Sequence, residues 1–441
     1  MPTEQHRVTD EAGVEFTLGP KIAGGAQGTV YRVSGHPEYA IKLLNRPEDL
    51  EKIAVVRRLP LDGLPVAAPI TLIRQGGHGY LMRLASDMTP IREPYLPSEV
   101  GPRETNAAWY LSTGGLKRRL AIAANMADSI AALHERGLAY VDLNPNNVMV
   151  SDDPGRTETW LIDTDNLTSR TDPKWDLLGF PGYAAPERVT RHSPPSTLSD
   201  TYILAIHVFR LLVLRHPLEG IAADALDGDT ARTLRDRGEL PYVGDPSDDS
   251  NHLAQRSFPA GIFPIVMSGR MSQLAERTFV AGRLDPTKRP GSARWREVLF
   301  SALDNVIECA SGCGWTYYRL RMACPNCGTP TPATTLVTVY PSWDDKPLTA
   351  RDSFVVSDYR DTSVMPRHLW GRYDQLDPVV TLRPESDGLE MTARDDASVI
   401  DGSGKVIKKI PKLSVNKVYR VRLDVNDRPS RFLAVRLVQP A

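Results

Sequence analysis

The first part of the chain alternates apolar and polar residues in short runs that are separated by turns. Such alternation with a period of two predicts β-strands that bury one face. One longer segment, Glu48–Leu59, has helical spacing instead. We therefore expect a small, mostly β lobe over residues 15–85. Its predicted strands are Val30–Val33, Tyr39–Leu44, Ile70–Ile73 and Tyr80–Leu84.

Beyond this lobe the apolar positions recur with the period of a helix. The first long helix is expected to end at Gly137, and Ile203–Leu214 is apolar nearly all round, which predicts a buried helix. Residues 227–260 are rich in Asp, Gly, Pro and Ser and are expected to be irregular. Ala293–Ile307 returns to helical spacing. These patterns predict a larger, helical lobe over residues 86–305.

After Pro332 the helical spacing disappears and β-branched residues dominate. We expect residues 335–441 to form a separate small all-β domain. The fold class is thus predicted to be α+β, with a bilobal body over 15–305 that is followed by a short cysteine-bearing segment and this domain. The predicted strands of the last domain include Val379–Leu382, Val418–Leu423 and Phe432–Val438.

Composition favours a folded protein with a packed core, because 41% of the 441 residues are hydrophobic and 24% are charged. The formal net charge of -1 does not favour nucleic acid as a partner. No run of about eighteen apolar residues occurs, so no membrane-spanning helix is expected. The N-terminus lacks the pattern of a secretory signal, and the chain has four cysteines, which together favour the cytoplasm.

Three glycines, Gly24, Gly25 and Gly28, occupy a predicted turn between two strands. Glycine can take positive φ angles and exposes backbone N–H groups without a Cβ atom, so a turn of this kind can cover phosphate groups. A plain hairpin is the simpler alternative. The glycines by themselves do not decide between these two interpretations.

Lys42 follows the glycine turn, in a predicted strand. A lysine on a strand is usually solvated, but one close to a glycine flap can reach the α- and β-phosphates of ATP. Glu51, on the next predicted helix, is our candidate for the carboxylate that holds this ammonium, and Glu48 is the alternative. The competing interpretation of Glu51 is an exposed helical glutamate.

Two aspartates and one asparagine have the types needed for phosphoryl transfer to a hydroxyl. One carboxylate must orient the hydroxyl and accept its proton, and another must bind magnesium. Asp142 suits the first role and Asp163 the second, while Asn147 can supply a neutral oxygen to the metal. The alternative is that Asp142 belongs to an ordinary turn and that Asp163 ends a strand.

All four cysteines fall between residues 306 and 330, as two pairs. Pairs of this spacing let two sulfurs converge on one ion, and two such turns complete a tetrahedral zinc site. No cysteine is left over, so a structural site is favoured over a catalytic one, and disulfides are the alternative. We expect a zinc ribbon over residues 306–330. Its ligands are Cys309, Cys313, Cys324 and Cys327.

The order of these motifs resembles that of the eukaryotic-type protein kinase family over about residues 15–305. The stretches that carry the resemblance are Ile22–Val30 for the glycine-rich loop, Ala40-Ile41-Lys42 for the strand lysine, Tyr140–Asn147 for the catalytic loop, and Asp163-Thr164-Asp165 and Gly182–Glu187 for the activation segment. The resemblance implies that Asp200 holds the catalytic loop and that Glu187 pairs with Arg289. It also implies ATP-binding by Gly24, Gly25, Gly28, Val30, Ala40, Lys42, Asn147 and Asp163, with Mg²⁺ on the last two.

Several positions depart from the family pattern. Val141 replaces the arginine that receives an activation-loop phosphate, so we expect that such phosphorylation is not the main switch. Asp165 replaces a glycine and leaves a second carboxylate near the metal. Asn144 and Phe180 replace a lysine and a threonine that meet near the acceptor hydroxyl in Ser/Thr members. Their joint loss indicates an altered acceptor pocket.

The combined patterns predict a protein kinase that transfers the γ-phosphate of ATP to a protein hydroxyl of serine or threonine, with C-terminal modules for docking partners. Lys42, Asp142, Asn147 and Asp163 are all present, which favours an enzyme. Two alternatives stay open. One is a catalytically silent pseudokinase that binds nucleotide as a scaffold, and the other is a kinase of small molecules.

A narrower resemblance concerns the domain order and the stretches Val141–Asn147 and Gly238–Tyr242. These features look similar to bacterial kinases associated with tellurite-resistance phosphorylation modules. That resemblance implies a von Willebrand-type partner and a metal-dependent phosphatase. The C-terminal β domain loosely resembles small sandwich modules such as FHA domains, without their specific residue signature, so protein docking is the expected role.

Overall fold

The computed structural model describes residues 6–92, 103–169, 180–190, 193–342, 348–386, 388–411, 417–423 and 429–439. The chain divides into two compact units. The first comprises residues 1–114 and 121–296, and the second comprises residues 115–120 and 297–441.

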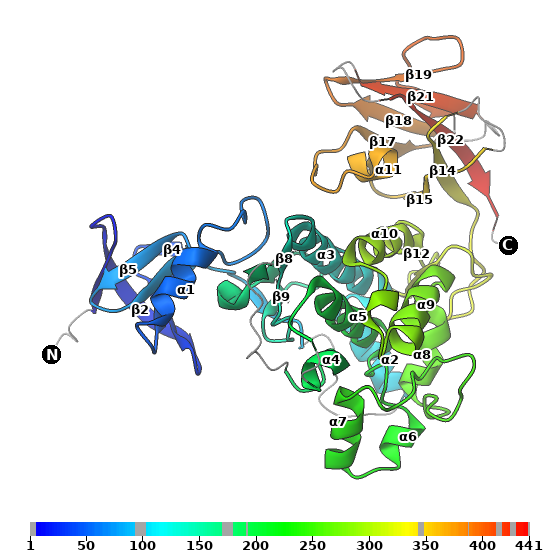
Figure 1. Cartoon of the computed structure of the whole chain (residues 1–441). Coiled ribbons are helices and arrows are strands. Elements are labelled where there is room, and N and C mark those ends of the chain that lie inside the picture. The colour runs from blue at the N-terminus through cyan, green and yellow to red at the C-terminus, as the bar shows by residue number, and fades with distance from the viewer. Residues whose placement is uncertain are drawn as a thin grey trace. The chain divides into compact units, whose positions relative to one another are not determined.

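Six strands at the start of the first unit close into a barrel, in the order β1-β2-β3-β4-β6-β5 (Figure 1). The ring is closed by β1, which pairs with both β2 and β5 and precedes residue 15, where the sequence pattern sets the start of the lobe. The elements of this lobe are β1 (Arg7–Asp10), β2 (Glu15–Gly24), β3 (Gly28–Val33), β4 (His36–Leu44), α1 (Asp49–Val56), β5 (Thr71–Gln75) and β6 (Gly79–Arg83).

Side chains of β4 and β6 alternate between the two faces of the barrel wall, as the period of a strand requires. Ile41 and Leu81 join the apolar cluster that also holds Val8, Val33 and Ile73. Ala40, Tyr80 and Met82 belong to a second cluster, together with Leu50 and Ile53 of helix α1. This alternation places Lys42 on the same face as Ala40, against which α1 packs.

The rest of the first unit is mainly helical, and its central helix is α5. A capping box starts α5, in which the N–H of Ser199 donates to the side chain of Ser196, and Leu214 with a φ of 64° ends it. The elements are β7 (Met88–Pro90), α2 (Arg103–Ser112), α3 (Gly115–Glu135), β8 (Leu138–Ala139), β9 (Val148–Ser151), β10 (Thr159–Leu161), η1 (Thr164–Asn166), β11 (Thr168–Ser169), α4 (Pro186–Val189), α5 (Thr197–Val213), α6 (Ile221–Asp224), α7 (Gly228–Asp236), α8 (Phe258–Val266), α9 (Gly269–Glu276), η2 (Arg277–Ala281), η3 (Pro286–Lys288) and α10 (Ser292–Leu303).

Two expectations from the sequence pattern are wrong in this region. Residues 227–260 are not wholly irregular, because Asp227 accepts backbone hydrogen bonds and starts helix α7. None of the residues of α7 is buried, so its sequence shows no apolar periodicity from which a helix could be predicted. Helix α10 ends at Leu303, and Val306–Glu308 forms strand β12 instead of a helical continuation.

The end of the chain carries a hairpin and two antiparallel sheets. The hairpin joins β12 and β13, and the sheets have the orders β15-β14-β22-β21-β19 and β16-β17-β18-β20 (Figure 1). Both sheets contribute to one apolar core, for example with Val337 and Leu382. The elements are β12 (Val306–Glu308), β13 (Thr316–Tyr318), β14 (Thr334–Tyr340), β15 (Asp352–Val356), β16 (Thr362–Val364), α11 (Pro366–Trp370), β17 (Val380–Glu385), β18 (Gly388–Ala393), β19 (Ala397–Ile400), β20 (Lys409–Pro411), β21 (Lys417–Leu423) and β22 (Arg431–Val438).

Among the residues that the structure describes, no helix combines the length and the apolar character needed to cross a bilayer.

Candidate active site

The ammonium of Lys42 is the centre of a buried charge cluster. It donates to Asp163 at 2.5 Å and to Asp165 at 2.6 Å. The amide oxygen of Gln27, from the turn between β2 and β3, accepts from the same ammonium at 3.3 Å. The hydroxyl of Tyr80 donates to the second oxygen of Asp165 at 2.6 Å. Residues that are far apart in the sequence thus meet around one lysine.

The charges in this cluster are not fully balanced. Burial opposes the charge on Lys42, but Asp165 and Asp163 outweigh it and raise the pKa of the ammonium. Burial also raises the pKa of Asp163, since one lysine does not fully compensate two neighbouring carboxylates. The side chain of Asp163 is 27% exposed. A second cation beside Asp163 fits this excess of negative charge.

The glycine turn approaches strand β4 through its backbone. The N–H of Gly25 donates to the carbonyl of Gly28 at 2.9 Å. A Cβ atom at Gly28 would lie only 2.3 Å from the carbonyl oxygen of Leu43, whereas one at Gly25 would meet open space. Gly24, Gly25 and Gly28 do not have positive φ angles. The structure therefore requires glycine at position 28 for close strand contact.

Val30, Ala40 and Lys42 lie on one face of the sheet. Val30 is opposite Lys42 in the register of β3 and β4, and it packs against the cluster that contains Ala40. Cross-strand partners point to the same side of a sheet. The structure thus brings together the residues expected to cover and hold a nucleotide on this face.

Asp142 is held by two amides of the catalytic loop. The side chain of Asn144 donates to one carboxylate oxygen at 2.9 Å, and that of Asn147 donates to the other at 3.0 Å. Because the amide nitrogen of Asn147 is engaged in this way, its oxygen is the atom that can face a metal. The carbonyl of Asn147 accepts from the N–H of Ile162, which places Asn147 beside the residue that precedes Asp163.

Asp200, at the start of α5, holds the backbone of the catalytic loop through hydrogen bonds. Its carboxylate accepts from the backbone N–H groups of Tyr140 at 2.6 Å and Val141 at 2.9 Å. Val141 has a φ of 75°, a strained conformation for a β-branched residue. The two hydrogen bonds hold that conformation, and His134 contacts the same carboxylate at 3.1 Å. The role that the kinase resemblance implies for Asp200 is confirmed.

Glu51 is not brought to Lys42. It lies exposed on α1, and Glu48 is exposed as well. The helix instead presents Lys52, whose ammonium donates to the side chain of Asn166 at 3.0 Å. The carboxylates that pair with Lys42 come from the segment after β10 and not from the helix.

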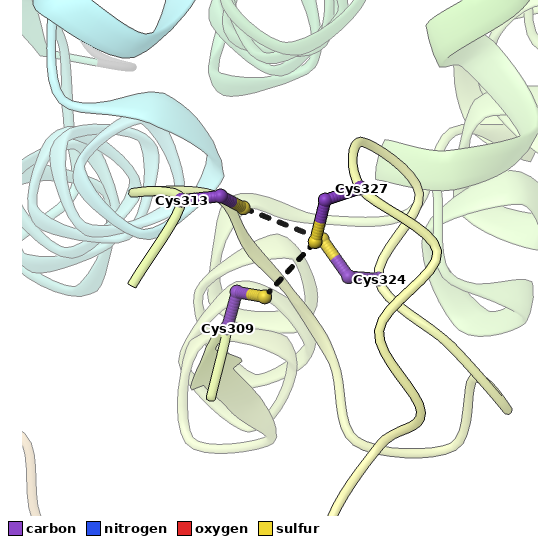
Figure 2. A group of neighbouring side chains, drawn as sticks. All are labelled: Cys309, Cys313, Cys324 and Cys327. Carbon is purple, nitrogen blue, oxygen red and sulfur yellow. Dashed lines mark hydrogen bonds between the residues drawn. The ribbon is translucent and has the colours of Figure 1, made fainter. Parts of the chain in front are cut away.

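The four cysteines converge in the second unit, as Figure 2 shows. The sulfur of Cys309 lies 3.5 Å from that of Cys327, and the sulfur of Cys313 lies 3.7 Å from that of Cys324. All four sulfurs are within 4.8 Å of one another. Sulfurs bound to one tetrahedral zinc at about 2.3 Å are about 3.8 Å apart. The geometry therefore fits a zinc ion with four thiolate ligands.

A second group of metal-capable side chains, Asp304, Asp352 and His368, also lies within 4.8 Å. Arg367 already donates to both carboxylate oxygens of Asp304, at 2.5 and 2.9 Å. The imidazole of His368 contacts the same carboxylate at 3.1 Å. This group is an ion-pair network that joins the residue after α10 to helix α11.

The two-lobed body and its charge cluster define the class of protein. The lysine lies on the barrel face against which α1 packs, and the helical lobe supplies the loop that carries Asp142 and the aspartate after β10. The profile of the protein kinase domain matches residues 16–295, and the chain belongs to the protein kinase family.

Individual relatives agree with this membership. The chain is similar to "Protein kinase YegI" of Escherichia coli, with 25% identity over 337 residues that cover 73% of this chain and 50% of the relative. It is also similar to "Serine/threonine-protein kinase PknL" of Mycobacterium tuberculosis, with 28% identity over 237 residues that cover 49% of this chain and 55% of the relative. The chain spans about half the length of these curated relatives.

Sequence reasoning missed the part that Tyr80 and Asn144 play at the site. The sequence pattern shows Tyr80 only as a residue of a predicted strand, and its position opposite Lys42 depends on the pairing of β4 with β6. Asn144 departs from the family pattern, and that departure does not predict its hydrogen bond to Asp142. Register and loop conformation carry this information, and a single sequence does not show them.

Proposed function

We propose that this chain is an active kinase that transfers the γ-phosphate of ATP to a serine or threonine hydroxyl of a protein. The observation that carries the proposal is the arrangement of Asp142. Its two carboxylate oxygens are oriented by Asn144 and Asn147. Asp142 is close enough to Asp163, the partner of Lys42, to act on its charge. A fixed carboxylate in this position is suited to accept the proton of an attacking hydroxyl.

The roles of the other residues follow from their positions. Lys42 would hold the α- and β-phosphates, with Gly24, Gly25 and Gly28 above them and Val30 and Ala40 against the base. Asp163 and the side-chain oxygen of Asn147 would hold Mg²⁺, which neutralises charge on the transferred phosphoryl group. The buried negative excess around Asp163 supports this assignment.

Labelled-ATP transfer tests the proposal. Asp142→Asn and Asp163→Asn should each lower the transfer rate by about 10²–10⁴-fold, the range expected for the loss of an acid–base or metal-binding group. Asp152, which is exposed, provides the matched control as Asp152→Asn. Equal rates for the wild type and both active-site variants would contradict the proposal. Peptides that offer only serine, threonine or tyrosine then identify the acceptor.

A nucleotide-binding scaffold is the second candidate. It is favoured by Asn144 and Phe180, which replace a lysine and a threonine. In Ser/Thr members of the protein kinase family these two positions meet near the acceptor hydroxyl. Nucleotide binding without label transfer to any peptide or to the chain itself would support the scaffold. The hydrogen bond from Asn144 to Asp142 weighs against it, because it preserves the orientation of the catalytic carboxylate.

We further propose that residues 306–330 form a zinc ribbon, in which Cys309, Cys313, Cys324 and Cys327 bind one structural zinc ion. The separations between the sulfurs support this assignment. Metal analysis of the purified full chain should find about one zinc per chain. The variant Cys324→Ser should lose that zinc, and a metal-free wild type with an intact fold would contradict the proposal.

The two C-terminal sheets suit a docking module over residues 335–441. We propose a protein partner for it, in the manner of an FHA-like sandwich, and the resemblance to tellurite-resistance module kinases suggests a von Willebrand-type protein and a metal-dependent phosphatase. We propose the cytoplasm as the location, because the four cysteines are free of disulfides and are assigned to zinc. Co-purification of the tagged full chain with and without residues 335–441 tests the docking role.

A further inference from the structure

Asp165 is the residue of the charge cluster around Lys42 that has no role in the proposed phosphate transfer. It lies in the turn η1, and its side chain is only 4% exposed. One carboxylate oxygen accepts from the ammonium of Lys42 at 2.6 Å, and the other accepts from the hydroxyl of Tyr80 at 2.6 Å. A buried anion needs donors on its oxygens, and here both oxygens have one.

The barrel wall supplies both of these donors from adjacent strands. Lys42 and Tyr80 stand opposite each other in the register of β4 and β6. Their side chains therefore leave the sheet on the same face. Asp165 reaches this face from the helical lobe. Its carboxylate therefore links strands β4 and β6 to the turn η1.

Helix α1 offers Lys42 no comparable anion. Glu51 is exposed, and within the described part of the chain it makes no ion pair or hydrogen bond through its side chain. The helix meets η1 through Lys52, which donates to Asn166. Lys52 brings a positive charge toward η1. Helix α1 is therefore unsuited to neutralise the ammonium of Lys42.

We infer that Asp165 is the positioning residue that holds Lys42 in place for nucleotide binding, in the role that the sequence assigned to Glu51. The inference rests on the proposed function of this site. The two carboxylates differ in exposure and therefore in role. Asp163 is 27% exposed and is within reach of a nucleotide-bound cation, whereas Asp165 is buried. When Asp163 turns toward such a cation, Lys42 keeps Asp165 as its anion.

The test compares the two possible anchors by equilibrium binding of a fluorescent ADP analogue to the full chain. Asp165→Asn should raise the Kd at least about tenfold, the usual scale for one lost charge-assisted hydrogen bond. Glu51→Gln represents the competing anchor and should change the Kd less than about twofold. Glu38→Gln removes an exposed carboxylate from the same strand as Lys42 and serves as the matched control.

Tyr80→Phe provides an independent variant. It removes one donor to Asp165 without changing any charge, and it should raise the Kd in the same direction by a smaller factor. In steady-state transfer, both Asp165→Asn and Tyr80→Phe should raise the KM for ATP. Thermal unfolding of each variant shows whether it is folded, and where Asp165→Asn does not fold, Tyr80→Phe decides.

Unchanged nucleotide binding in Asp165→Asn, or in Tyr80→Phe as its substitute, overturns the inference. A loss in Glu51→Gln as large as that in Asp165→Asn overturns it as well. A wild-type chain that binds the analogue but transfers no phosphate refutes the proposed function alone, because the binding measurement still ranks the two anchors.

Discussion

Arg289 and Glu187 form a two-point ion pair across 102 positions of the chain, with both N–O distances at 2.7 Å. The guanidinium also lies over the ring of Tyr202, with 4.5 Å between its central carbon and the ring centroid. The pair therefore joins the end of the activation segment to helix α5 and to the loop before α10. It confirms the pairing implied by the kinase resemblance.

Removing Arg289 should destabilise the kinase unit strongly. The side chain of Arg289 is fully buried and that of Glu187 is 10% exposed, so Arg289→Ala leaves an uncompensated carboxylate in a buried place. We expect the free energy of unfolding to fall by about 3–5 kcal/mol, as measured by urea denaturation. Arg156→Ala breaks an exposed pair with Glu158 and should leave the transition unchanged. Similar midpoints for the two variants would contradict the prediction.

Asn144 should act on catalysis and not on nucleotide binding. Asn144→Ala removes the donor to one oxygen of Asp142 but leaves the hydrogen bond from Asn147. We expect kcat to fall by about tenfold, the scale of one lost orienting hydrogen bond, with the Kd for nucleotide unchanged. A parallel rise in Kd would show that Asn144 supports the nucleotide site as a whole.

Chelation of zinc should affect the second unit selectively. The hairpin β12–β13 is short, and the proposed ion closes the loops that carry all four cysteines, so its removal takes away folding free energy. After treatment with a strong zinc chelator, a thiol reagent should titrate four cysteines quickly. The untreated chain should react slowly. Fast reaction of four thiols before chelation would argue against a bound metal.

The pair between Asp304 and Arg367 should make stability depend on pH. Burial alone would raise the pKa of Asp304, but Arg367 and His368 lower it from 3.8 to about 2. A lowered folded-state pKa means that the stabilisation is complete above about pH 4 and disappears as the pH falls through 2. It amounts to about 2 kcal/mol at neutral pH.

The variant Asp304→Asn provides the comparison. The difference in unfolding free energy between the wild type and this variant should be constant from pH 7 to about pH 4 and should shrink below that. Arg372→Gln, which removes an exposed arginine of the same unit, serves as the control. A difference that does not change with pH would assign the effect to packing.

The strands and helices with strong periodicity could be predicted from the sequence. The runs around Tyr39–Leu44 and Ile203–Leu214 correspond to β4 and α5, because burial of one face or of all faces leaves a clear pattern. Helix α7 could not be found in this way, since it buries none of its residues and depends on the cap at Asp227.

The site was predictable in its residue types but not in its pairings. Lys42, Asp142, Asn147 and Asp163 stand in motifs of the chain, and the structure brings Lys42 and Asp163 into contact and joins Asp142 to Asn147. Which carboxylate meets Lys42 depends on the orientation of α1 and on the turn η1. A single residue of rotation on a helix moves a side chain by about 100°, and the sequence does not fix such a rotation.

Strand β1 seals the N-terminal barrel by bonding to β2 on one side and to β5 on the other. A sealed cylinder offers no open row of N–H and C=O groups to another chain. A shortened protein that begins at residue 15, where the periodicity of the sequence predicts the start of the lobe, lacks this strand. The edges of β2 and β5 that pair with β1 would then be exposed. Such a fragment should self-associate, so a protein prepared for biochemical work should include Arg7–Asp10.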